Sequence, residues 1–159
     1  MALDLLLTFG LILLNGFFVA AEFAIVKVRS AQVDLKASKG NKVAGIAKNI
    51  VEHMDVYLSA CQLGITMASL ALGWIGEDVF SAIVLRFFDL VGITVSPESA
   101  HQIVFPAAFA LLTIFHIVLG EQAPKTIGIR HPLATTMGIS IPLKIFYILF
   151  SPFIWVLNN

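Results

Sequence analysis

Long apolar runs alternate with short polar stretches along this chain. The first run covers residues 2–26, the second residues 56–75, and the third residues 101–129. A helix needs about 20 mainly apolar residues to cross the hydrocarbon core of a membrane, so each run is long enough to span it. The pattern predicts a single all-α integral membrane domain, covering residues 1–159, with three transmembrane helices.

The segment between the first two runs, residues 30–55, is basic and has one apolar side. Its apolar positions recur at the spacing of a helix, which is typical of an amphipathic helix. These positions are Val43, Ile46, Ala47, Ile50, Val51 and Met54. A basic helix of this kind suits the anionic surface of a cytoplasmic leaflet.

Polar stretches that contain glycine or proline are expected to break the chain after the second run. Gly76-Glu77-Asp78 is expected to end the span, and residues 79–95 are expected to form a short interfacial or hairpin helix. A further full span over these residues is the less favoured alternative. Ser96-Pro97-Glu98-Ser99 predicts a turn before the third span.

The C-terminal segment, residues 132–157, allows two interpretations. It is apolar, but Pro132, Pro142 and Pro152 recur at ten-residue intervals and Lys144 lies in its middle. A fourth span would strand Lys144 inside the bilayer. We therefore predict a bent juxtamembrane helix on the inner face of the membrane, with a fourth span as the alternative.

Composition supports the membrane class. Hydrophobic residues make up 58% of the chain and charged residues only 13%, whereas soluble domains are about 45–50% apolar and about 25% charged. The net charge of zero argues against nucleic acid as a partner. The first apolar run contains Asp4 and has no basic region before it, so we interpret it as a retained span rather than a signal peptide.

The distribution of basic residues predicts an orientation. Six of the ten Lys and Arg residues lie between the first and second spans, and only Arg86 lies between the second and third. Loops rich in Lys and Arg stay in the cytoplasm. We expect a multi-pass protein of the inner (plasma) membrane, with its N-terminus outside and its C-terminus in the cytoplasm.

Glu121 is the most informative candidate for function. It follows the uncharged run 103–120 and is followed by Pro124 and Lys125. An ionisable side chain at membrane depth costs about 2.5–3.5 kcal/mol on insertion scales and usually serves a function. A bound cation would offset this cost, although a plain interfacial ion pair with Lys125 is an alternative.

Neutral oxygens are available close to Glu121. Pro124 has no N–H to donate to the carbonyl of Gly120, so this oxygen is left for another partner. Together with side-chain oxygens from a facing helix, it would form an all-oxygen shell of the kind that Mg²⁺ or Ca²⁺ takes. Na⁺ is a further candidate.

Two other spans carry polar positions on one helical face. In the second span these are Ser59, Gln62, Thr66, Ser69 and Gly73. In the first span Asn15 and Glu22 are seven residues apart and share a face. Helix packing without a substrate is the alternative for the second-span stripe, and pairing with Lys27 or Arg29 is the alternative for Glu22.

Nothing in the sequence resembles a nucleophile–base pair, a phosphate-binding loop or a haem motif, so we predict that the chain is not an enzyme. Cys61 is the only cysteine, which excludes an intrachain disulfide. A small buried thiol is its favoured interpretation.

Three motifs resemble those of the CorC/cyclin M (CNNM) family of magnesium transporters, in the bacterial branch named after haemolysins. Residues 15–24 resemble the family's opening motif FF-x-x-x-E-x-A, and residues 120–125 resemble its GE-x-x-PK signature. Residues 59–73 resemble its second-span motif. The three motifs follow the family's order and cover nearly the whole chain.

The resemblance implies a homodimer with three spans and a juxtamembrane helix in each protomer, in contact with the lipid bilayer. It implies Mg²⁺ transport, usually efflux and with possible exchange for Na⁺. Members of the family continue into a cytosolic pair of nucleotide-binding CBS domains, which are expected downstream of residue 159.

The resemblance also places the family's acidic site at Glu121 and its glycine at Gly120. The positions where the family has hydroxyl side chains in the first span correspond to Asn15 and Val19 here. The position where the family has an asparagine in the second span corresponds to Ile65 or Thr66. Val19 and Ile65 have no side-chain oxygen and therefore depart from the family's pattern.

The leading hypothesis is a Mg²⁺ transporter domain that binds its ion near Glu121. The expected metal ligands are Glu121, Gly120, Asn15, Gln62, Thr66, Ser59 and Glu22. An ion-sensing or scaffold module that regulates a partner without transport is the alternative. A membrane-lytic haemolysin is a third hypothesis, disfavoured by the ordered polar faces.

Overall fold

A computed structural model describes residues 2–92, 96 and 100–158, and these residues contain helices and no strand. The all-α class is therefore confirmed. Of the predicted turn, Pro97, Glu98 and Ser99 lie outside the described residues.

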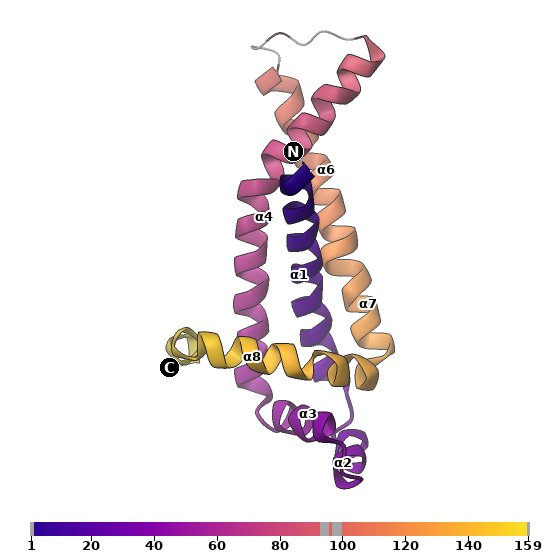
Figure 1. The fold of residues 1–159 in the computed structure, drawn as a ribbon, viewed down its shortest axis with the longest axis vertical. Coiled ribbons are helices and arrows are strands. Elements are labelled where there is room, and N and C mark those ends of the chain that lie inside the picture. The colour runs from indigo at the N-terminus through magenta and orange to yellow at the C-terminus, as the bar shows by residue number, and fades with distance from the viewer. Residues whose placement is uncertain (1, 93–95, 97–99, 159) are drawn as a thin grey trace.

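Helix α1, Ala2–Lys27, is the centre of the fold (Figure 1). It packs against α4, Met54–Val91, most extensively, and also against η2, His116–Gln122, α7, Ala123–Arg130, and α8, Pro132–Asn158.

Two short helices follow α1. They are α2, Ser30–Ser38, and α3, Lys42–Glu52, and Gly40 between them takes a φ of 82°. The side chain of Asn41 accepts a hydrogen bond from the N–H of Ala44 at 3.1 Å and so caps the start of α3. Ala44, Ala47 and Ile50 are buried, so α3 has one apolar side, whereas Met54, the last of the predicted apolar positions, already belongs to α4.

The predicted end of the second span at Gly76-Glu77-Asp78 is wrong. Helix α4 runs through these residues and ends only at Gly92, which has a φ of 79°. The separate helix expected over residues 79–95 is therefore the second half of α4. Tertiary packing explains the continuity: a Cβ on Gly76 would lie 2.9 Å from Cδ1 of Leu112, so the glycine allows α4 to approach its neighbour closely.

The third predicted span is continuous from residue 100 to residue 130. It consists of η1, Ala100–Val104, α6, Phe105–Phe115, then η2 and α7. Its bounds agree with the predicted span 101–129. Ile12 of α1, Leu72 of α4 and Ala108 of α6 belong to one buried cluster, which holds the three long segments together.

The predicted number of spans differs from the number of membrane-length helices in the structure. Among the described residues, four helical segments are long and apolar enough to cross a membrane, not three, and the additional one is Pro132–Val156 within α8. Figure 1 shows that α8 lies across the ends of α1 and α4 instead of alongside them. Its rings pack on both helices, with Phe146 4.7 Å from Phe18 and Tyr147 4.9 Å from Tyr57 between ring centroids.

Candidate functional site

Asn15 joins three helical segments through two hydrogen bonds. Its Nδ2 donates to the carbonyl of Gly120 at 2.9 Å, and its Oδ1 accepts from Oγ of Ser69 at 3.1 Å. The side chain is only 2% exposed, so the bond to Gly120 lies in a low-dielectric interior, while the bond to Ser69 is partly buried. Asn15 of α1 thus links α4 to η2 at a single point.

The carbonyl of Gly120 has a partner outside its own helix, which agrees with the expectation from Pro124. However, the helix is not interrupted at the proline. The backbone forms a wider π turn over η2, in which the N–H of Ala123 donates to the carbonyl of Val118 five residues earlier. Such a bulge accommodates a proline without ending the helix.

Glycines bring the backbones of α1 and η2 into contact. A Cβ on Gly120 would lie 3.4 Å from the carbonyl oxygen of Ile12 on α1, and a Cβ on Gly16 would lie 3.3 Å from the carbonyl oxygen of Leu119 on η2. The Cβ on Gly16 would also lie 2.7 Å from Cγ of Pro124, at the start of α7. These spaces leave little room for a side chain, so the hydrogen bond from Asn15 relies on glycine at both positions.

Glu121 lies next to this contact but on the uncovered side of η2. Its side chain is exposed and makes no hydrogen bond or ion pair with another residue that the structure describes. The alternative ion pair with Lys125 is not formed. Instead, Nζ of Lys125 lies 4.7 Å from the ring centroid of Phe23, in a cation–π contact.

The remaining predicted ligands do not meet Asn15 and Gly120. Gln62 and Thr66 are exposed on α4, and the Thr66 hydroxyl donates to the carbonyl of Gln62 at 2.9 Å. Ser59 is half-buried, and its hydroxyl donates to the carbonyl of Asp55 at 3.1 Å. Glu22 is half-buried on α1. The polar stripe of α4 therefore reaches Asn15 only through Ser69.

Ser69 was absent from the predicted ligands although it lies on that stripe. Its distinguishing feature is its partner Asn15, 54 residues away, which helical spacing within one span cannot reveal. Val19, one of the two departures from the family pattern, is buried in the packing of α1.

The described residues hold no group of three or more His, Cys, Asp or Glu side chains that could bind a metal ion. A cation bound here would therefore rely on one carboxylate and on neutral oxygens. Backbone carbonyls, amides and waters can complete a Mg²⁺ or Ca²⁺ shell around few carboxylates.

Comparison with known proteins places the chain in a family. The model for the cyclin M transmembrane N-terminal domain matches residues 6–159. The UPF0053 protein YhdT of Bacillus subtilis is 44% identical over 99% of this chain and 34% of its own length. The protein MT1889 of Mycobacterium tuberculosis is 34% identical over 97% of this chain and 43% of its own length.

A more distant relative is the UPF0053 protein sll0260 of Synechocystis. It is 28% identical over 98% of this chain and 34% of its own length. The chain thus spans about a third of the length of most of these relatives.

Proposed function

Because this chain belongs to the cyclin M transmembrane domain family, we propose that it is the membrane domain of a Mg²⁺ transporter. The proposed direction is efflux, with Na⁺ as the candidate coupling ion. The family is not a known class of enzymes, and we propose no reaction for the chain.

The uncovered carboxylate of Glu121 is the observation on which this proposal depends. It lies in a helical segment long and apolar enough to cross a membrane, and no described residue neutralises it. Keeping an unpaired acid in such a segment is costly, and binding a cation would recover part of the cost. The neighbouring Gly120 carbonyl adds a neutral oxygen beside it.

The hydrogen bonds of Asn15 could change when an ion binds. In the structure its Oδ1 is occupied by Ser69 and its Nδ2 by Gly120. Oδ1 and the carbonyl oxygen of Gly120 each have two lone pairs, so an ion could use the second lone pair or take the place of the hydrogen bond. We propose that ion binding exchanges these hydrogen bonds for metal contacts, so that occupancy alters the junction between α1, α4 and η2.

Ser59, Gln62, Thr66 and Glu22 would join the ion only in another arrangement. Gln62 and Thr66 face outward from α4 in this chain. A movement of α4 relative to η2, pivoting at the π turn, would be needed to bring them to Glu121. We propose that alternating access uses this movement, with the π turn as its pivot.

We propose that the end carrying α2 and α3 faces the cytoplasm, because most basic residues lie there. The N-terminus would then be outside and the C-terminus inside, in the plasma membrane. A juxtamembrane position of α8 fits its placement across α1 and α4. The proposed assembly is a homodimer.

Flux through liposomes tests the function. Protein reconstituted into vesicles that enclose a Mg²⁺-sensitive dye should raise the dye signal when Mg²⁺ is added outside. Vesicles without protein are the control. A sensor or scaffold would bind Mg²⁺ without flux, and that result would refute transport.

A second dye, too large for an ion pathway, tests for lysis. It should stay inside the vesicles while Mg²⁺ enters. Release of the large dye together with Mg²⁺ entry would favour the haemolysin hypothesis instead.

A further inference from the structure

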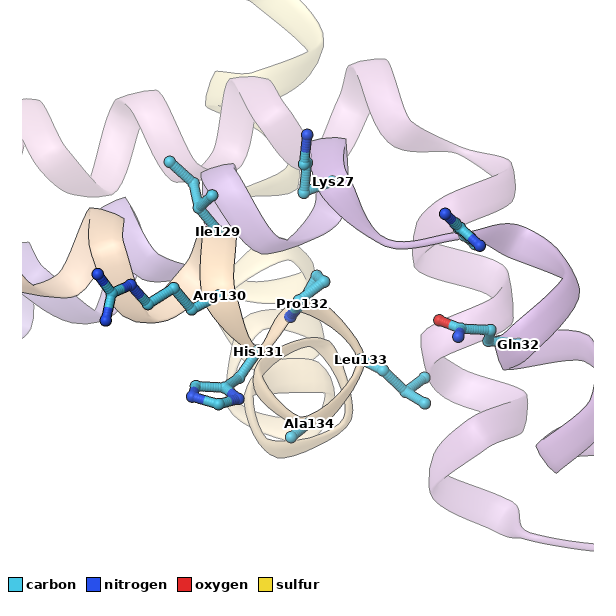
Figure 2. Close-up of a pocket in the computed structure, with 9 residues that line it drawn as sticks. Lys27, Gln32, Ile129, Arg130, His131, Pro132, Leu133 and Ala134 are labelled. Atoms are coloured by element: carbon cyan, nitrogen blue, oxygen red, sulfur yellow. The ribbon is translucent and has the colours of Figure 1, made fainter.

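A basic pocket lies at the end of the bundle where α1 passes into α2 and α7 passes into α8 (Figure 2). It is open and encloses about 540 Å³. Its lining includes Lys27, Arg29, Arg130 and His131, but no acidic residue. In Figure 2, Gln32 of α2 and Leu133 of α8 extend toward one another, while Arg130 and His131 lie at the turn between α7 and α8.

The charges of this pocket are not compensated within the described part of the chain. Among the described residues, both ion pairs between side chains involve Lys48, which lies outside the pocket. None involves Lys27, Arg29 or Arg130. These three side chains are exposed. Cations that share a small volume repel one another, so an anion placed between them would be stabilised by each.

The backbone adds to the attraction for an anion. Helix α8 is 27 residues long and begins at this pocket with Pro132, Leu133 and Ala134, without an acidic residue in its first turn. The N–H groups of a first helical turn have no partner inside the helix and carry a partial positive charge. Phosphate groups bind readily at such a place when side-chain cations are also present.

The surroundings of the pocket favour a lipid over a soluble anion as its ligand. The pocket lies at the ends of two membrane-length segments, α1 and Gln102–Arg130. Ile129, which lines the pocket, is 40% exposed, and two apolar residues close in sequence to its lining are also exposed, Val26 by 58% and Ile127 by 54%. A ligand with a phosphate and acyl chains would satisfy the cations and cover these side chains, which inorganic phosphate cannot do.

We propose that this pocket binds the phosphate headgroup of an anionic phospholipid from the adjacent leaflet. Basic pockets between membrane helices bind acidic headgroups by the same chemistry. The bound lipid would join the end of α1 to the α7–α8 turn. This assignment is independent of the transport proposal, because it uses none of the candidate ion ligands.

Lipid titration of the 159-residue chain in detergent, followed by native mass spectrometry, tests the assignment. Phosphatidylglycerol carries a net negative charge and phosphatidylcholine does not, although both contain a phosphate. The wild-type protein should bind phosphatidylglycerol more tightly. Equal binding of the two lipids would overturn the proposal without the need for any variant.

Paired variants locate the site. Arg29→Gln together with Arg130→Gln should weaken phosphatidylglycerol binding by about tenfold or more, since each basic residue near an anionic lipid contributes about 1 kcal/mol. The control, Lys36→Gln with Lys39→Gln, removes the same charge from α2 and from the residue after it, outside the pocket. It should keep wild-type affinity, and an equal loss in both double variants would contradict a localised site.

Two further arms complete the test. Arg29→Lys with Arg130→Lys retains the charge and should retain most of the binding, which checks that the arginines are not needed for folding. Inorganic phosphate in excess should leave phosphatidylglycerol bound. Displacement of the lipid by inorganic phosphate would instead assign the pocket to a soluble anion and overturn the lipid proposal.

Discussion

Helix α1 and the segment Gln102–Arg130 are both strongly apolar, but protein covers them to different degrees. In the most apolar stretch of each, 44% of the α1 residues are buried, against 22% for Gln102–Arg130. Helix α1 contacts α4, α7, η2 and α8, whereas α6 packs chiefly on α4 and α7 chiefly on α1. Hydropathy therefore identifies a membrane segment without telling which of its sides faces protein.

The polar residues of the two segments follow this difference. Asn15 of α1 is buried, and both ends of its amide are hydrogen-bonded. Glu121 is exposed and has no partner among the described residues. A buried and bonded amide contributes to the fold, while an unpaired acid on an uncovered side contributes nothing to packing. The contrast separates a residue that already joins helices through hydrogen bonds from one whose charge is left open to a ligand.

Among the variants, Glu121→Gln should have the largest effect, and the effect should be on Mg²⁺ affinity. The amide keeps the size of the side chain but removes the charge, so Mg²⁺ binding measured by calorimetry should weaken by more than about 100-fold. Changing a residue that only supports a metal ligand already costs about 10–100-fold in affinity. Thermal stability should change little. Unchanged Mg²⁺ affinity would refute Glu121 as the ion ligand.

Asp78→Asn is the matched control for that variant. Asp78 is also an exposed acid in a membrane-length helix, but it lies on α4 and outside the candidate site. Its substitution should leave Mg²⁺ affinity as in the wild type. A similar loss in both variants would mean that binding reflects overall negative charge.

Gly128→Ala tests how tightly α1 covers α7. A Cβ there would lie 2.7 Å from the carbonyl oxygen of Ala20 and 3.2 Å from the backbone N of Ala24. Because backbone atoms cannot turn aside as a side chain does, we expect a loss of about 1–3 kcal/mol in the free energy of unfolding.

The control is Gly138→Ala on α8, where a Cβ would meet nothing within 4 Å. Alanine in a helix interior is favoured over glycine by about 0.5–1 kcal/mol, so this variant should be as stable as the wild type or more so. Thermal unfolding in detergent measures both. If the two alanines have the same effect, α1 and α7 are not packed as closely as the structure has them.

Asn15→Ala removes the hydrogen bond that connects α1 to the segment Gln102–Arg130 at Gly120, together with the bond from Ser69. It leaves the buried Gly120 carbonyl without its donor, and hydrogen bonds between membrane helices contribute about 0.6–1.7 kcal/mol. We expect a loss of that size in the free energy of unfolding. Thr66→Ala is the control, because the exposed Thr66 hydroxyl bonds only to its own helix and should be dispensable.

Local patterns predicted the segments that packing did not alter. The apolar run at 101–129 matches the helical stretch that ends at Arg130, and helical spacing located α3. The proline rule anticipated that the carbonyl of Gly120 would be left for an outside partner. Each of these features depends on residues close together in the sequence.

Long-range contacts account for what the sequence did not reveal. The end predicted at Gly76 failed because the glycine accommodates Leu112, 36 positions later, and does not end the helix. The donor to Gly120 is Asn15, 105 residues away, and no periodicity within one span connects them. The composition of residues 132–157 could not decide between a span and a helix lying across the bundle.

Substitution of Lys48 should have the smallest effect on stability. Lys48 lies outside both α1 and the segment Gln102–Arg130, so it serves as a reference for an exposed charge. Its Nζ lies 3.1 Å from Asp34 and 3.7 Å from Glu52. The hydrogen bond to Asp34, followed by the charges of Asp34 and Glu52, raises the pKa of Lys48. All three side chains are largely exposed, so the ion pair between α2 and α3 should contribute little.

The sign of its pH dependence follows from that raised pKa. The contribution is fully present below the pKa of lysine in the unfolded chain and is lost as the pH rises through the folded-state pKa. Lys48→Gln should therefore lower the unfolding temperature slightly at neutral pH, and the difference should vanish at strongly alkaline pH. Lys39→Gln, which removes a lysine without an ion pair, is the control. If Lys48→Gln destabilised the protein as much as Asn15→Ala, the buried junction at α1 would not be the feature that sets stability.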